Sequence, residues 1–170
     1  KHIETTLIGA GRGKRYTQGS VNPVTQRASS LVFDSVAAKK HATAQRAHGE
    51  LFYGRRGTLT HFALQDAMVE LEGGAGAVLT NTGMSAILLV TTVFLKPGDL
   101  LVAPHDCYGG SYRLFDSLAK RGCYRVQFVD QSDEQALRAA LAEKPKLVLV
   151  ESPSNPLLRV VDIAKICGLE

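Results

Sequence analysis

Residues 77–104 of the chain read AVLTNTGMSAILLVTTVFLKPGDLLVAP, and this stretch decides the fold class. The short apolar run at 77–79 is followed by a turn with a glycine, an apolar segment of helical length and a second apolar run at 100–103. Short apolar runs that alternate with helical segments are typical of βαβ units, in which a helix connects two parallel strands. We therefore predict an α/β fold with a parallel sheet and right-handed crossovers.

The same alternation continues toward the C-terminus. Apolar runs at 124–129 and 147–150 predict two more strands, and Ser132 with Gln135 three residues later predicts a capping box that opens a helix over 133–143. In open parallel sheets, ligands bind beyond the carboxyl ends of the strands. Four segments are therefore expected to surround one ligand: 80–85, 104–110, 130–132 and 151–155.

The first 72 residues have a different pattern. Residues 1–33 contain several glycines and no sustained period, which predicts an extended arm. A helix is predicted within 34–48, capped by Asp34 or Ser35 and stopped by Gly49, and a second helix over 60–72. The polar segment 51–58 between them is predicted to be a loop.

Composition excludes several classes of protein. The 170 residues are 45% hydrophobic and 21% charged, which is typical of a globular domain and not of a disordered chain. Because no apolar run has the length of a membrane span and the first residues do not resemble a signal peptide, we expect a soluble cytoplasmic protein. The three cysteines, Cys107, Cys123 and Cys167, are widely spaced, and we expect them to be reduced, mostly buried and without a chemical role.

Charge is unevenly distributed along the chain. Residues 1–60 hold ten Lys and Arg against three Asp and Glu, whereas residues 61–170 hold ten against thirteen. A basic segment of this kind suits an anionic partner, which could be nucleic acid, an acidic membrane, a protein surface or a ligand phosphate. Composition alone leaves these alternatives open.

The segment 81–86, Asn-Thr-Gly-Met-Ser-Ala, carries the strongest indication of a binding site. It lies at a predicted helix start, where backbone N–H groups lack intrahelical acceptors and favour an anion, and Gly83 allows a phosphate to come close. The alternative is that Thr82 or Ser85 only caps the helix and Gly83 only turns the chain.

Three other segments are candidates for ligand contact. Tyr53 and Arg55 lie in the loop before the second helix, where a guanidinium could hold an anion, although a solvated turn is the alternative. Tyr108 follows the second strand and could stack on a flat ligand, or simply pack at the turn of Gly109 and Gly110. The segment 151–156, Glu-Ser-Pro-Ser-Asn-Pro, holds polar groups between prolines, and Glu151 could instead bind nearby backbone. The histidines lack the spacing of metal ligands, so no metal site is expected.

Taken in this order, these motifs resemble the cystathionine γ-synthase and β-lyase family of pyridoxal-phosphate (PLP) enzymes. The resemblance covers nearly all of this chain but less than half of a family member. It implies an aspartate-aminotransferase-like fold of type I, with residues 1–60 as an N-terminal arm and inter-subunit loop and 61–170 as the first part of the PLP-binding large domain. Residues up to about 71 look similar to β-lyase, whereas those from Gly73 onward look similar to γ-synthase, as in a fusion of the two or an intermediate member.

The resemblance also implies roles for individual residues. Gly83 and Met84, with Ser85 nearby, would bind the PLP phosphate, and Tyr53 and Arg55 would reach the phosphate in a neighbouring subunit. Tyr108 would stack on the pyridine ring and help to move protons, so Tyr108 and Tyr53 are the catalytic candidates. A further residue, Asn155, would hydrogen-bond the phenolic oxygen of the ring.

The function implied by the family is trans-sulfuration in methionine biosynthesis by a homotetramer built from dimers, acting on small amino acids, without nucleic acid or membrane. We expect γ-replacement, in which cysteine displaces succinate from O-succinylhomoserine to give cystathionine. The alternative is β-elimination of cystathionine to homocysteine, pyruvate and ammonia. No lysine of this sequence has the Ser-x-Thr-Lys context of the Schiff-base lysine, so a third alternative is a non-catalytic fragment or chimera, and we expect this chain alone to be inactive. A basic nucleic-acid-binding module is a fourth.

Overall fold

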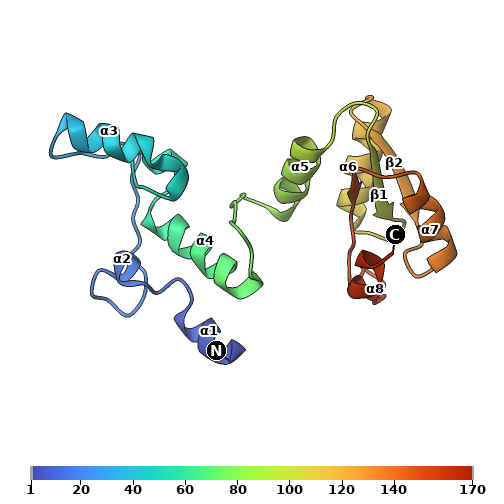
Figure 1. Cartoon of the computed structure of the whole chain (residues 1–170), viewed down its shortest axis with the longest axis horizontal. Helices are drawn as coiled ribbons and strands as arrows, with labels where there is room; N and C mark the ends of the chain where they lie inside the picture. The colour runs from blue at the N-terminus through green and yellow to red at the C-terminus, as the bar shows by residue number, and fades with distance from the viewer. Residues whose placement is uncertain (1, 170) are drawn as a thin grey trace. The chain divides into compact units, whose positions relative to one another are not determined.

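The computed structural model describes residues 2–169, which divide into two compact units, one up to Leu79 and one from Thr80 (Figure 1). The predicted division at residue 60 concerned function, namely an arm and an inter-subunit loop, and it stays a prediction. None of the helices within residues 2–169 has the length and apolar character needed to cross a membrane.

The first unit is helical. Its elements are α1 (Ile3–Gly9), α2 (Lys14–Thr17), α3 (Val36–Ala44), the 3₁₀ turns η1 (Arg46–His48) and η2 (Gly54–Arg56), and α4 (Leu59–Glu72). The predicted cap of α3 is confirmed, because the Ser35 hydroxyl accepts a hydrogen bond from the Ala38 N–H. The prediction of an extended arm was wrong for residues 3–9 and 14–17, since α1 and α2 form there and both contact α4.

A small core ties this arm to α4. Tyr16, Leu59 and Ala63 are buried together, and the Tyr16 hydroxyl donates a hydrogen bond to the Asp66 carboxylate. Burial and this carboxylate raise the pKa of Tyr16 to about 12. The amide oxygen of Gln26 accepts a hydrogen bond from the Leu59 N–H at 3.0 Å, which satisfies one of the free N–H groups at the start of α4.

The second unit is a three-stranded parallel sheet with helices. Its elements are α5 (Gly83–Phe94), β1 (Leu100–Pro104), α6 (Gly109–Lys120), β2 (Arg125–Val129), α7 (Glu134–Ala142), β3 (Leu147–Val148) and α8 (Ile163–Cys167). The strand order is β2-β1-β3, with Leu101 of β1 opposite both Val126 and Leu147. The prediction of a parallel sheet with helical crossovers is confirmed.

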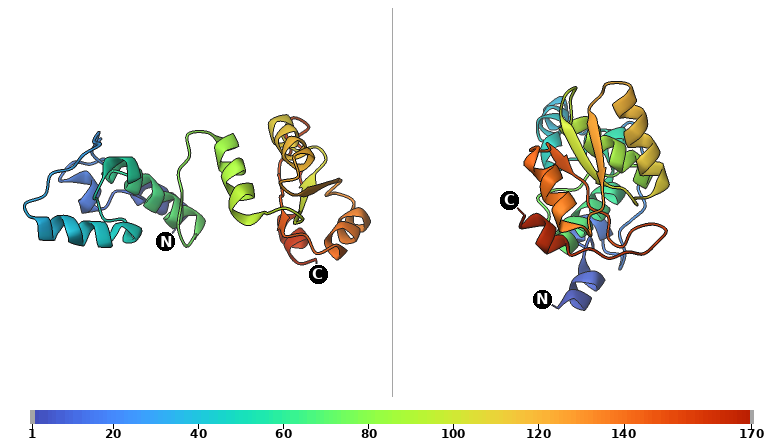
Figure 2. Two further views of the ribbon diagram at one scale, coloured as in Figure 1. Left: turned by 90° about the horizontal axis from the view of Figure 1, so that it is seen from above. Right: turned by 90° about the vertical axis from the view of Figure 1, so that its right-hand side faces the viewer.

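Strand β1 is buried on both faces. Leu100 and Val102 pack with Leu137 of α7 and Ile166 of α8, whereas Leu101 and Ala103 pack with Phe115 of α6 and with Tyr124. Figure 2 shows α6 and α7 on opposite sides of the strands. The chain passes from β1 through α6 to β2 on one side of β1, and then from β2 through α7 to β3 on its other side. Two crossovers of the same hand that run in opposite directions place their helices on opposite faces of the sheet. Because the three strands are parallel, their carboxyl ends lie at the same edge of the sheet.

Three local predictions were wrong. Residues 77–79 form no strand, because Val78 is 75% exposed and the Ala77 carbonyl accepts a hydrogen bond from the Gln65 side chain. The N-cap of α7 is Asp133, since its carboxylate accepts from the N–H groups of Gln135 and Ala136, while Ser132 donates to Asp130. The three thiols are free as predicted, but Cys167 is exposed.

Candidate functional site

The start of α5 presents two backbone N–H groups without acceptors. The Thr82 hydroxyl accepts from the Ser85 N–H at 3.0 Å, and the Thr82 carbonyl accepts from the Ala86 N–H. Within residues 2–169, the N–H groups of Gly83 and Met84 have no hydrogen-bond partner. Thr82 is thus a cap, as the simpler interpretation held. The two N–H groups lie at the positive end of a 12-residue helix, which is the chemistry that binds a phosphate.

Ser85 differs from Gly83 and Met84 because its N–H is not free. Its N–H is already bonded to Thr82, and its hydroxyl lies 2.9 Å from the Asn81 side-chain oxygen. Of the three residues predicted to meet a phosphate here, Gly83 and Met84 offer free N–H groups, whereas the Ser85 hydroxyl already donates to Asn81 and accepts from the Thr82 hydroxyl.

Beyond β1, the Tyr108 ring folds over Gly110 at the start of α6. A Cβ on Gly110 would overlap the ring of Tyr108 and lie 3.1 Å from the Met84 sulfur. Only glycine therefore leaves room for the ring at this point. Tyr108 is 46% exposed, so the ring packs on the glycine turn with part of its surface accessible, and Met84 and Tyr108 are brought together.

Beyond β3, Glu151 connects Tyr108 with Asn155. Both carboxylate oxygens lie 3.1 Å from the Tyr108 nitrogen, and one of them accepts from the Asn155 N–H at 3.0 Å. Glu151 therefore binds backbone, as one of the two interpretations of the sequence held. The two backbone segments that it joins carry the predicted ring contacts.

Arg159 was not predicted as part of this region. Its guanidinium donates to Asp130 at 3.1 Å and to the Ser132 hydroxyl at 2.7 Å, and lies 3.4 Å from Asp106. It thus joins the segments after β1 and β2 to its own loop after β3. Its carboxylate partners are 53 and 29 residues away in sequence, so no local pattern could have indicated the contact.

The ionisation of this cluster follows from its hydrogen bonds. The hydroxyl and N–H of Ser132, together with Arg159, lower the pKa of Asp130 to about 2. Hydrogen bonding to Asp130 raises the pKa of Arg159 in turn. At neutral pH the cluster is therefore a charged network that joins the loops after the three strands.

Cys107 lies directly before Tyr108 but is unsuited to nucleophilic chemistry. Burial, followed by the charge of Glu151, raises the pKa of its thiol to about 11. The thiolate is the reactive form of cysteine, so Cys107 is inert near neutral pH.

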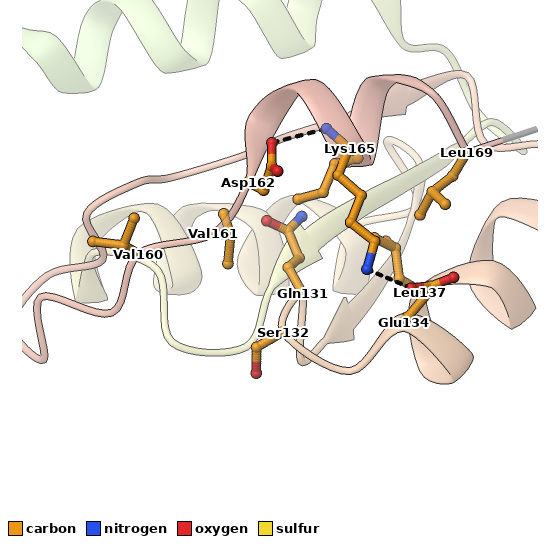
Figure 3. Close-up of a pocket in the computed structure, with 10 residues that line it drawn as sticks. Gln131, Ser132, Glu134, Leu137, Val160, Val161, Asp162, Lys165 and Leu169 are labelled. Atoms are coloured by element: carbon orange, nitrogen blue, oxygen red, sulfur yellow. Dashed lines mark hydrogen bonds and ion pairs between the residues drawn. The ribbon is translucent and has the colours of Figure 1, made fainter.

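A separate hollow of about 210 Å³ lies between α7 and α8 (Figure 3). Lys165 pairs with Glu134 at 2.6 Å, and the Asp162 carboxylate caps α8 by accepting from the Lys165 N–H. Of the four segments expected to surround a ligand, only 130–132 reaches this hollow, through Gln131 and Ser132, and none of the individual cofactor-binding candidates lines it. Within residues 2–169, no group of His, Cys, Asp and Glu has the arrangement of a metal site.

In the first unit, Tyr53 and Arg55 lie together. The Arg55 guanidinium carbon is 4.8 Å from the centroid of the Tyr53 ring, a cation–π geometry. Gly54 between them donates to the Ser29 carbonyl at 2.7 Å, and a Cβ at this position would overlap the Ala28 carbonyl. The arm thus fixes the backbone between the two side chains.

Comparison with known proteins gives consistent relatives. Cystathionine gamma-synthase of Escherichia coli (strain K12) is 86% identical over 124 residues, which are 73% of this chain and 31% of that protein. Cystathionine beta-lyase MetC of the same strain is 46% identical over 166 residues, which are 98% of this chain and 42% of that protein. The 124 residues exceed the stretch that follows residue 72, so the match extends into the residues before it.

Solved structures agree on the fold. The crystal structure of cystathionine gamma synthase from Xanthomonas oryzae pv. oryzae, in complex with aminoacrylate and cysteine, matches with a TM-score of 0.87 and 42% identity. The match covers 99% of this chain and 41% of that one, so the chain spans less than half the length of its relatives. The predicted fold class is confirmed as a partial α/β domain with a parallel sheet. A family model described as Cys/Met metabolism PLP-dependent enzyme matches residues 4–170, and the chain therefore belongs to this PLP-dependent family.

Proposed function

We propose that this chain is the cofactor-binding part of a PLP-dependent trans-sulfuration enzyme. The observation that supports this most strongly is the clustering of Gly83 and Met84 N–H groups, the Tyr108 ring and the Asn155 loop in one unit, connected through Gly110 and Glu151. The arrangement fits PLP, because the free N–H groups suit its phosphate and the partly exposed ring suits its pyridine. When bound, PLP supplies the electron withdrawal that the protein lacks.

The chain's own residues then bind and orient. The start of α5 holds the phosphate, with the Ser85 hydroxyl beside it. Tyr108 would stack on the ring and hold a proton at its hydroxyl oxygen, and the Asn155 side-chain amide would donate to the ring oxygen. From a neighbouring copy, Arg55 would add positive charge at the phosphate and Tyr53 a hydroxyl donor, which gives the basic first 60 residues a partner.

For the reaction we propose γ-replacement in a cytoplasmic homotetramer, with O-succinylhomoserine and cysteine as substrates. The 86% identity to a γ-synthase supports it. The second candidate is β-elimination of cystathionine, which is supported by the β-lyase match over 98% of the chain. We also propose that the 170 residues alone are inactive, because no lysine has the Schiff-base context.

The phosphate contact can be tested by replacing Gly83 with proline. Proline is tolerated at the first position of a helix and removes the N–H, and Thr82 before it is already extended, with φ of −150° and ψ of 157°. We expect G83P to weaken binding of pyridoxamine 5′-phosphate about tenfold, since one hydrogen bond to a charged group is lost. Isothermal titration measures this.

The matched control is G83A, which keeps the N–H and adds a methyl group that meets no atom within 4 Å. Because it keeps the N–H that G83P lacks, it should bind pyridoxamine 5′-phosphate more tightly than G83P. Equal affinity of G83P and G83A for the phosphate ligand would contradict the proposed phosphate site.

The reaction can be tested by joining the chain to the remaining part of the E. coli γ-synthase and, separately, of the E. coli β-lyase. We expect cystathionine formation from O-succinylhomoserine and cysteine with the γ-synthase remainder. If β-elimination is the faster reaction with both remainders, the second candidate is right.

A further inference from the structure

Glu151 holds together the two backbone segments that carry the proposed ring contacts. Its carboxylate accepts from the Tyr108 N–H at 3.1 Å and from the Asn155 N–H at 3.0 Å. Tyr108 is the N-cap residue of α6, and Asn155 belongs to a loop outside regular structure. Neither N–H has another acceptor within residues 2–169.

The loop that carries Glu151 is itself fixed at its far end. The Ser154 N–H donates to the Arg159 carbonyl at 2.9 Å, and the Ser154 hydroxyl accepts from the Arg159 N–H at 3.2 Å. The Arg159 guanidinium then binds Asp130 and Ser132, which follow β2. The segment 151–159 is thus a loop closed by Ser154 and Arg159 and bound through Arg159 to the segment after β2.

We propose that Glu151 is a positioning residue that sets Tyr108 and Asn155 at one fixed spacing, so that a ring can contact both at once. This inference rests on the proposed function. In this role the carboxylate acts through the two N–H groups and not by its own contact with the ring. Because these hydrogen bonds involve a charged acceptor, they are stronger than neutral ones and suit this role.

The ring and the phosphate of the ligand would bind to different residues. Tyr108 and Asn155 are the ring contacts, whereas the phosphate meets Gly83 and Met84 at α5. Loss of Glu151 should therefore weaken the binding of a ligand that has a ring and leave the binding of inorganic phosphate unchanged. A general loosening of the unit would weaken both.

The variants are E151A, which removes both acceptors, and E151Q, which keeps one oxygen within reach of both N–H groups but places an amide NH₂ near the Tyr108 N–H. The matched control is E134Q, because Glu134 is a paired surface carboxylate on α7 that bonds Arg138 and Lys165. For pyridoxamine 5′-phosphate we expect about tenfold weaker binding by E151A, an intermediate loss for E151Q and no change for E134Q. Inorganic phosphate should bind all four chains within about twofold.

Amide hydrogen exchange of the same chains without ligand tests the geometry independently. In E151A the N–H groups of Tyr108 and Asn155 should both exchange at least tenfold faster, with E134Q unchanged. Unchanged protection of either N–H, or an equal loss of affinity for both ligands, would overturn the positioning role. If the unchanged chain binds no pyridoxamine 5′-phosphate, the proposed function fails, and the exchange result alone decides whether Glu151 fixes this pair.

Discussion

At Gly110, the absence of a side chain decides where an aromatic ring lies. A Cβ there would overlap the Tyr108 ring, whereas a Cβ on the adjacent Gly109 meets only the end of the flexible Arg113 side chain at 3.4 Å. The two glycines are consecutive residues of α6, so their alanine variants differ mainly in this contact.

We expect G110A to displace the Tyr108 ring and to weaken binding of pyridoxamine 5′-phosphate about tenfold, whereas G109A should bind normally. Titration of both variants, with the NMR signals of the Tyr108 ring as a second measurement, checks this. Matching affinities in the two variants would show that the ring position does not matter for binding.

Asp130 should make stability depend on acid pH. Ser132 and Arg159 hold its pKa at about 2 in the folded chain, below the value of about 3.9 usual for an unfolded aspartate. The stabilisation is therefore fully present above about pH 4 and is lost as pH falls toward 2. Since the side chain is partly exposed, the effect should stay below about 1 kcal/mol.

Urea unfolding of the unchanged chain and of D130N between pH 6 and pH 2 measures this difference. The two free energies of unfolding should converge as the pH falls through this range. A difference that stays constant down to pH 2 would mean that Asp130 has no such role.

Local signals predicted some helix caps and missed others: Thr82 caps α5 as one interpretation held, whereas Asp133 and not Ser132 caps α7. The free N–H groups at Gly83 and the cap at Thr82 follow from the start of a helix, which short-range sequence shows. Arg159 could not be predicted, because its role depends on three loops that only the folded sheet brings together.

At the scale of elements, β1 shows why the sheet could be predicted. Its continuous apolar run is the pattern of a strand covered on both faces, and helices cover both faces. Residues 77–79 have the same local pattern, but no strand lies beside them within the described chain. A strand forms only when it pairs with a neighbouring strand, and a short apolar run does not show whether such a neighbour exists. The arm was partly missed for a similar reason, because α1 and α2 depend on contacts with α4.

The cap of α7 gives a prediction at this scale. Asp133 accepts from two N–H groups of the first turn, so D133A should lower the free energy of unfolding by about 0.5–2 kcal/mol, while D133N should retain most of the cap. Urea denaturation measures both. A loss of stability in D133N as large as in D133A would assign the effect to charge and not to the cap.

At the scale of the whole molecule, the family and the fold were predicted from the order of several motifs along the chain. Each motif alone had a simpler interpretation, and in two cases the simpler one is also true: Thr82 caps a helix, and Glu151 binds backbone. These structural roles place the candidate contacts, because the cap leaves two N–H groups free and the carboxylate connects Tyr108 with Asn155.

The central claim is that loops after successive parallel strands, together with the start of α5, surround one phosphate-bearing ring. The most direct measurement is the change in backbone amide NMR signals of the 170-residue chain on titration with pyridoxamine 5′-phosphate. We predict saturable shifts at Gly83, Met84, Tyr108 and Asn155, with inorganic phosphate shifting only the first two. Shifts confined to other surfaces, or none at these four residues at saturation, would contradict the account.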